Sequence, residues 1–353
     1  MSQLEKRINV RSQAAGTRNF RQLMLNSALL LGVILFAAQV AVAAVPSDIP
    51  AGMGPLPTKV PDNPKNPMTP AKIELGKKLY FEPALSASGQ FSCNSCHNLS
   101  TYGVDNQPFS IGHRWQRGGR NSPTVMNAAF WSKQFWDGRA PLLEDQAKGP
   151  ALNPVEMASK DSAEVVARLK AAGYQAEFEA VFGKKAALTY DNMANAIAAF
   201  ERTLVTPNAP FDKYARGEGE ISAAAKRGMK KVVEVGCTSC HSGALFTNNL
   251  FMKFNHGTDE GMKSVTGKDS DSHRFRVQSW RNVAMTAPYF HDASAATLEE
   301  AVEIMAKVQL NRTLLKDEVS DIVAFLKTLT GESPVITYPI LPRPAGKTLE
   351  WRD

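Results

Sequence analysis

The 353-residue chain is poor in cysteine, and none of its four cysteines is left over for a disulfide, a zinc site or a free nucleophile. All four belong to two short motifs. Apolar and polar residues nowhere alternate over a sustained stretch, which excludes a fold built on amphipathic strands. The sequence also lacks a basic stripe interleaved with aromatic residues, and this excludes nucleic acid as a partner.

Two pentapeptides of the form C-x-x-C-H contain all the cysteines: Cys93-Asn94-Ser95-Cys96-His97 and Cys237-Thr238-Ser239-Cys240-His241. This pattern is the attachment site of a c-type haem. The two thiols bond to the porphyrin as thioethers, and the histidine offers an imidazole nitrogen to the iron. A redox dithiol and half of a zinc site are the alternatives, but a histidine directly after the second cysteine in both copies favours haem. The sequence therefore predicts a cytochrome c with two covalent haems.

Residues 1–43 predict an export signal. Five basic residues stand within residues 1–21, and an uncharged run follows over 22–47. The small residues Ala41 and Ala43 suit a signal peptidase, so we expect cleavage before Ala44. An uncleaved anchor is the alternative, because the run is long enough to span a bilayer. Both alternatives put the remainder outside the cytoplasmic membrane, and the predicted location is the periplasm.

Several helices are predicted from their first residues. Thr69 followed by Pro70 is typical of an N-cap and first helical position, and it predicts a helix through residue 81. Further helix starts with a capping residue are Asp161, Ser222 and Thr297. Apolar residues three or four positions apart predict two more helices, over 193–204 and 319–329. The predicted fold class is all-α.

The order of helices and haem motifs forms a coarse internal repeat, which predicts two c-type cytochrome domains in tandem. We expect an N-terminal haem domain over 44–206 and a C-terminal haem domain over 207–332. Residues 46–70 hold eight of the 21 prolines and predict an extended N-terminal arm. The tail, 333–353, is predicted to pack back on the first domain.

The second axial ligand of each iron decides between electron transfer and chemistry, because a filled position transfers electrons and an open one binds a substrate. The candidates after the second motif are Met252, Met262, Met285 and Met305. Met305 is favoured, since small c-type cytochromes place this methionine late, before the final helix. The candidates after the first motif are Met126, Met157 and His113, and spacing does not choose among them.

Four longer segments, 79–97, 110–127, 134–150 and 282–291, resemble the bacterial dihaem cytochrome c peroxidase family. The similarity runs from about Pro70 to Leu329. It is far more specific than the haem motifs, because it extends through residues that the motifs do not require. The activity that the resemblance implies is reduction of hydrogen peroxide to water.

The resemblance also implies roles for residues at the first haem. His97 would be the proximal ligand of an N-terminal, low-potential haem at which peroxide reacts. His113 matches the distal histidine that holds the sixth position at rest and moves away on activation. Glu156 matches the acid–base glutamate above this haem, and Gln146 the glutamine beside it. Trp136 matches a tryptophan between the two haems.

Further roles concern the second haem and the junction of the domains. His241 and Met305 would ligate the C-terminal, high-potential electron-transfer haem, and His291 matches a histidine near its propionates. The family also has a calcium site, whose matching ligands are Asn121 and the backbone carbonyls of Thr286 and Pro288. The implied partners are a small c-type cytochrome or a cupredoxin as electron donor, and a second copy of the chain in a homodimer.

Two other functions remain as alternatives. Dihaem enzymes of the same fold crosslink tryptophans in a partner protein, but they have a tyrosine where this chain has Met305. A dihaem electron carrier with both iron sites closed is the second alternative. Glu156 and Gln146 near the first haem argue against that carrier.

Overall fold

The computed structural model describes residues 46–185 and 187–343. The predicted export signal, its cleavage site and the end of the tail lie outside these residues. Contacts within the chain assign residues 43–353 to one unit, and the description below concerns that unit. Within the described ranges, no helix is both long and apolar enough to cross a membrane.

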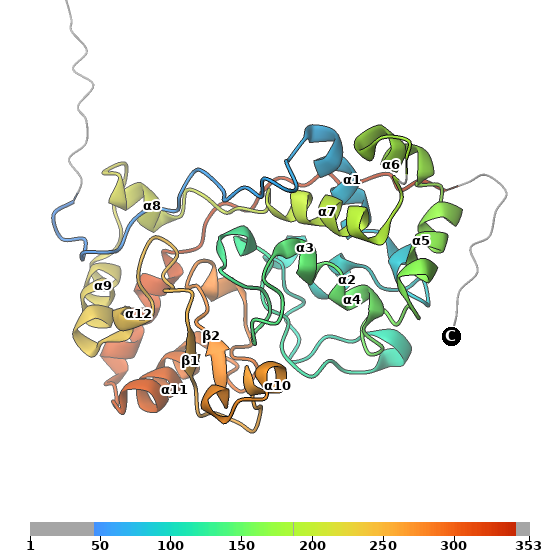
Figure 1. Ribbon diagram of the computed structural model, residues 1–353. Helices are drawn as coiled ribbons and strands as arrows, with labels where there is room; N and C mark the ends of the chain where they lie inside the picture. The colour runs from blue at the N-terminus through green and yellow to red at the C-terminus, as the bar shows by residue number, and fades with distance from the viewer. Residues whose placement is uncertain (1–45, 186, 344–353) are drawn as a thin grey trace, which may run out of the picture. The chain divides into compact units, whose positions relative to one another are not determined.

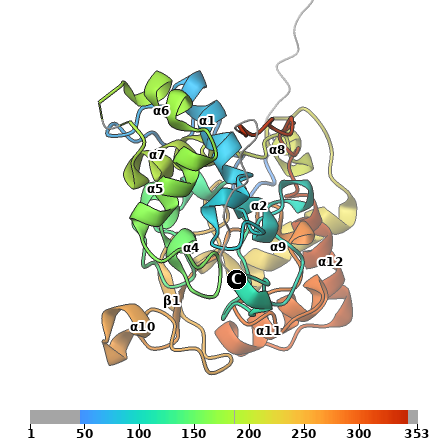
Figure 2. The same cartoon turned by 90° about the vertical axis from the view of Figure 1, so that its right-hand side faces the viewer.

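The fold is mostly helical, as predicted. The first half contains α1 (Pro70–Tyr80), α2 (Cys93–Cys96), α3 (Leu143–Gln146), α4 (Gly149–Leu152), α5 (Ser162–Ala171), α6 (Gln175–Phe182) and α7 (Tyr190–Glu201). The second half contains α8 (Pro210–Ala215), α9 (Ala223–Val235), α10 (Lys263–Thr266), α11 (Leu298–Leu310) and α12 (Lys316–Lys327). Figures 1 and 2 show that α1, α5, α6 and α7 gather together, while α9, α11 and α12 form a separate group.

The predicted helix starts are confirmed by their caps. The Thr69 hydroxyl accepts a hydrogen bond from Lys72 N (3.2 Å), and α1 begins at the next residue, a proline. Asp161 caps α5 through the backbone N–H three residues later, and Ser222 caps α9 in the same way. Thr297 and Glu300 form a reciprocal capping box at the start of α11. Local side-chain chemistry therefore sets these boundaries.

The all-α prediction misses a short antiparallel ribbon of β1 (Phe251–Lys253) and β2 (Arg274–Arg276). Within the largely polar segment 255–279, Phe275, Arg276 and Val277 are buried. The cause is long-range pairing, since Arg276 N donates to Trp136 O (2.9 Å) in the other half of the chain. Three-residue strands leave no periodic pattern that a sequence could reveal.

Each half is built around one pair of crossing helices. A Cβ added at Gly76 of α1 would lie 1.9 Å from the Ala196 carbonyl oxygen of α7. A Cβ added at Gly228 of α9 would lie 1.8 Å from the Asp321 carbonyl oxygen of α12. Only glycine permits such a backbone approach. The two helix pairs carry the buried core of their halves, and Cys93 and Cys237 pack against buried residues of these helices.

The described parts of the arm and the tail cross between the two halves. Leu56 N in the arm donates to the buried carboxylate of Asp212 (3.0 Å), which also forms an ion pair with Arg281 (2.6 Å). In the tail, the Arg343 guanidinium contacts the Glu82 carboxylate at 2.9 Å. The Tyr338 ring lies 4.5 Å from the ring of Phe81, next to α1.

Candidate functional site

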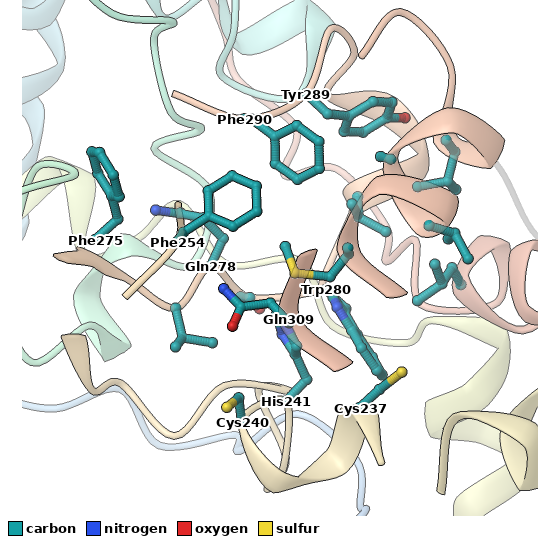
Figure 3. A pocket seen from close by; sticks show the side chains of 18 of the residues that line it. Cys237, Cys240, His241, Phe254, Phe275, Gln278, Trp280, Tyr289, Phe290 and Gln309 are labelled. Carbon is teal, nitrogen blue, oxygen red and sulfur yellow. The ribbon is translucent and has the colours of Figure 1, made fainter. Parts of the chain in front are cut away.

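The second haem motif borders a cavity of about 230 Å³, here called the second cavity. Cys237, Cys240 and His241 lie on one side of it (Figure 3). The rings of Tyr289 and Phe290 lie across from them. An apolar space facing two cysteines and a histidine is the environment that a covalently attached haem requires.

His241 is held in an orientation suited to iron ligation. Its Nδ1 lies 3.2 Å from Phe246 O, and its ring stacks on Trp280 with centroids 4.5 Å apart. A hydrogen bond at Nδ1 leaves Nε2 available to a metal. Burial lowers the pKa of His241 to about 4, so the imidazole is neutral at physiological pH.

Two of the four candidate methionines line the second cavity. Met305 reaches it from α11, together with Leu298 and Val302 of the same helix. Met252 reaches it from β1, and its exposed fraction is 37%. Neither Met262 nor Met285 is among the described lining residues, and Met285 is 42% exposed. The geometry thus reduces the alternatives to Met305 and Met252.

The polar groups of the second cavity suit an anionic cofactor. Arg276 is fully buried, and its Nη1 has no hydrogen-bond partner among the described residues. Burial lowers the pKa of Arg276 to about 9, since no carboxylate lies beside it. His291 Nε2 is also buried without a partner in the described part of the chain. Unpaired buried donors are costly, and the carboxylates of a haem would satisfy them.

The first haem motif borders a larger cavity of about 440 Å³, here called the first cavity. Cys96 and His97 line it, and His97 Nδ1 lies 3.4 Å from Gly103 O. Burial raises the pKa of Cys96 to about 11 and that of Cys237 to about 11. Redox-active C-x-x-C motifs have depressed thiol pKa values instead. The structure therefore argues against the dithiol alternative and fits haem attachment.

Glu156 and Gln146 both line the first cavity. Asn153 Nδ2 donates to Glu156 Oε1 at 2.7 Å and fixes the carboxyl group. Burial raises the pKa of Glu156, an effect that the charge of Arg139 partly offsets. A positioned carboxyl with a raised pKa can exchange protons near neutral pH, and sequence reasoning found it only through the family resemblance.

None of the three residues predicted as candidates for the sixth ligand of the first haem iron lines the first cavity. His113 is 7% exposed, and its backbone N–H donates to Glu156 O at 2.8 Å. Its side chain is not among the described groups that line the cavity, and neither are those of Met126 and Met157. His97 is the one histidine, and there is no methionine, among these lining residues. The role predicted for His113 therefore requires movement of its loop.

Trp136 lines both cavities. Its indole Nε1 donates to Asn121 O at 2.8 Å, which fixes the ring between them. The ring centroid lies 6.2 Å from that of His291, which lines the second cavity. This placement suits the predicted position between the haems.

The predicted calcium ligands are partly brought together. Asn121 Nδ2 donates to Pro288 O at 2.7 Å, and Thr286 and Pro288 both line the second cavity. Amide orientation is assigned from hydrogen bonding, so Asn121 can present its oxygen instead. No cluster of three or more His, Cys, Asp or Glu ligands occurs in the described residues. The calcium site stays a prediction.

The two halves share a repeat that the cysteine motifs do not reveal. Asn127 and Asn282 have the same left-handed backbone conformation, with φ 62° and ψ 12°. Asn127 N donates to Leu204 O (2.8 Å), and Asn282 N donates to Leu329 O (3.1 Å). Both side chains donate to the Thr206 hydroxyl, at 2.8 and 2.9 Å.

From these asparagines to the helix caps at Leu142 and Thr297, the two copies correspond without a gap. Each forms the same isolated antiparallel bridge, Gln134 with Ala140 and Tyr289 with Ala295. Inside these bridges, Phe-Trp-Asp at 135–137 matches Phe-His-Asp at 290–292. This phenylalanine–aspartate pattern is the signal in the sequence from which the repeat could have been found.

The repeat pairs Met305 in the second cavity with Pro150 in the first. The helix α11 is replaced there by α3 and α4, with Pro150 in the first turn of α4. Proline has no atom that ligates iron. The two cavities therefore differ at the position from which a thioether can reach the metal. Among the described lining residues, only the first cavity has acidic side chains, and Glu156 is one of them.

Comparison with known proteins gives consistent matches. The sequence model of the di-haem cytochrome c peroxidase family matches residues 70–220. A cytochrome c551 peroxidase of Pseudomonas aeruginosa is 44% identical over 300 residues, or 82% of this chain and 87% of that protein. A cytochrome c551 peroxidase of Nitrosomonas europaea is 45% identical over 305 residues, 83% of this chain and 90% of that protein. The crystal structure of a MauG-like protein associated with microbial copper homeostasis superposes with a TM-score of 0.71 at 28% identity, covering 82% of this chain and 96% of that one.

Proposed function

This chain belongs to the di-haem cytochrome c peroxidase family, which implies two haem c cofactors, and from that premise we propose that it reduces hydrogen peroxide in the first cavity. The electrons come from a small donor protein and enter at the second haem. The net reaction is H₂O₂ + 2 H⁺ + 2 e⁻ → 2 H₂O, with one electron from each of two donor molecules. The observation that carries the proposal is a contrast between the two cavities. Pro150 and Glu156 line the first cavity, whereas Met305 lines the second.

When bound at Cys93 and Cys96, the first haem supplies an iron with an accessible coordination position and stores an electron. The residues around it handle the protons. Glu156 would take a proton from one oxygen of the peroxide and return it to the other, because one carboxyl within reach of both can serve as base and then acid. Gln146 holds the peroxide in line through its amide. Burial of Glu156 keeps its proton affinity high enough for the second transfer.

The second half of the chain receives and relays electrons. His241 and Met305 hold the iron there, and a soft, neutral sulfur raises the potential, as an electron acceptor requires. Trp136, which borders both cavities, provides the path between them. Asn121, Thr286 and Pro288 would hold calcium beside this path, and His113 would close the first iron site at rest. A homodimer is part of the same proposal.

Steady-state turnover tests the function directly. Holo-protein is mixed with peroxide and either a reduced small c-type cytochrome or a reduced cupredoxin, each followed by absorbance. Consumption of two donor molecules per peroxide, with no release of oxygen, is expected for at least one donor. No peroxide-dependent oxidation of either donor, before or after partial reduction of the protein, would contradict it and favour a simple electron carrier.

A tryptophan-crosslinking enzyme of the same fold is the nearest alternative. Those enzymes have a tyrosine at the second haem where this chain has Met305. Met305 lines the second cavity, and a thioether does not stabilise the highly oxidised iron that such chemistry needs. Peroxide reduction is therefore the function we favour.

The export signal gives a separate prediction. The run 22–47 and the small residues Ala41 and Ala43 should direct cleavage, so that the mature protein begins at Ala44 and is found in the periplasm. N-terminal sequencing or intact-mass measurement of protein from its native host checks this. Recovery of residues 1–21 in a membrane fraction would contradict it.

A further inference from the structure

Two acidic side chains besides Glu156 line the first cavity, and the mechanism above uses neither. Asp259 forms an ion pair with Arg120 at 2.6 Å, whereas Glu201 forms none among the described residues. Glu201 ends α7 and is 4% exposed. Its Oε2 is buried, and among the described residues it accepts no hydrogen bond. A buried carboxyl without a hydrogen-bond donor is costly when ionised. Glu201 is therefore either protonated or paired with a group outside the described residues.

The charged and titratable neighbours of Glu201 do not supply that partner. From α1 the neighbour is the Tyr80 phenol, and from α2 it is Cys93, which becomes a thioether on haem attachment. Arg202 is adjacent, but both of its terminal nitrogens are engaged by Glu144 of α3, at 2.8 and 3.0 Å. The Glu144 carboxylate opposes the effect of that charge, since Arg202 lowers the pKa of Glu201 and Glu144 raises it. Glu201 itself forms no ion pair among the described residues.

The internal repeat shows that this carboxyl belongs to one haem only. Helices α7 and α12 correspond through their glycine contacts and through the asparagine bonds to Leu204 and Leu329. Ala196 and Asp321 are 125 residues apart (321 − 196), as are Leu204 and Leu329 (329 − 204). The same spacing pairs Glu201 with Leu326. Leu326 is 3% exposed and lines the second cavity. At one position beside the haem, the chain has a carboxyl in the first half and a hydrocarbon in the second.

We propose that Glu201 couples reduction of the first haem to the uptake of one proton, while Leu326 offers the second haem no such group. When the bound iron gains an electron from the second haem, Glu201 in its ionised form takes a proton from solvent. One electron and one proton then enter together, so the net charge of the buried site does not change. The inference rests on the proposed two-haem assignment, and it adds a store for a proton that peroxide cleavage consumes.

The pH range follows from the surroundings of Glu201. Burial raises its pKa from the ordinary 4.5 to about 8. A ferric haem beside it carries a positive charge that lowers this pKa, and reduction removes that charge and lets the pKa rise again. Between the two pKa values, reduction binds a proton and becomes harder as pH rises. We therefore expect the potential to fall with rising pH between these two pKa values of Glu201 and to be constant outside them.

The test is a spectroelectrochemical titration of holo-protein across this range, with no peroxide present. In the wild type, the reduction equilibrium of the first haem should change up to tenfold per pH unit, or about 59 mV. Glu201→Gln keeps the shape of the side chain and should make this potential independent of pH. Glu201→Leu, which copies Leu326, should do the same. The second haem is an internal control. Because His291 lines its cavity, any slope it shows should be the same in the wild type and in both Glu201 variants.

Two controls separate the proposal from its alternatives. Asp191→Asn alters an exposed carboxylate on α7, paired with Lys148 at the surface, and should keep the wild-type slope. Glu156→Gln should keep it as well. A slope that persists in both Glu201 variants, or is absent in the wild type, overturns the proposal, and a slope lost only in Glu156→Gln assigns the coupling to that residue. Because no turnover is measured, failure of the peroxidase assay would give a different result from failure here.

Discussion

Replacing Glu156 with glutamine is expected to lower peroxide turnover by roughly 10²–10⁴-fold, the share that a general acid–base group usually contributes. Glutamine keeps the size of the side chain and can still contact Asn153, whose Nδ2 lies 2.7 Å from Glu156 Oε1. It cannot take or return a proton. Haem content and the spectrum of the second haem should not change. Turnover with a reduced small cytochrome, measured at saturating peroxide, checks the result.

The pH profile sharpens this prediction. Burial raises the pKa of Glu156, and its first task requires the ionised form. Wild-type turnover should therefore fall as pH drops through that raised pKa, and the variant should lack this acid limb. Asp145→Asn, on α3 beside Gln146 but outside the lining of the first cavity, is a matched control and should behave as the wild type. Near-normal turnover in Glu156→Gln would show that another group moves the proton.

Replacing Met305 with histidine is expected to lower the potential of the second haem and to abolish turnover almost completely. A thioether favours the ferrous state, whereas an imidazole favours the ferric state. The change should be on the order of 0.1 V, within the roughly 0.8 V range that axial ligands set. The donor could then no longer reduce this haem efficiently. Potentiometry and donor oxidation measure the two effects in the same preparation.

The absorption spectrum identifies the ligand independently of turnover. Ferric Met305→His should lose the near-infrared sulfur-to-iron charge-transfer band, and both haems should stay attached through their cysteines. Met252, the other methionine that lines the second cavity, provides the control, and Met252→Leu should keep the band. Survival of the band in Met305→His together with its loss in Met252→Leu would reverse the assignment.

Much of the fold could be predicted because the signals are local. Thr69, Asp161 and Thr297 accept hydrogen bonds from residues three positions later, so a few adjacent residues determine where each helix begins. The haem motifs are local as well, since two thiols and a histidine must lie together on one short turn. The family resemblance stated from longer segments is also confirmed by the relatives.

The rest depends on contacts between distant residues. Nothing near Arg276 in the sequence indicates that it is fully buried, because its place is set by Trp136 O and the Trp131 ring, whose centroid lies 3.8 Å from its Cζ. Four methionines fitted the second haem until the lining of the second cavity distinguished Met305 and Met252 from the others. Glu201 looked like an ordinary helix-end glutamate, and only its match to Leu326 reveals the difference between the two cavities.

One measurement tests the central claim that peroxide reacts in the first cavity and not in the second. Holo-protein with only the second haem reduced is mixed with one equivalent of peroxide in a stopped-flow spectrometer. The account predicts that the spectrum of the first haem changes first, and that the second haem is oxidised afterwards, by electron transfer and without losing its sulfur ligation. A first change at the second haem, with loss of its methionine ligand, or no response of either haem to peroxide, would contradict it.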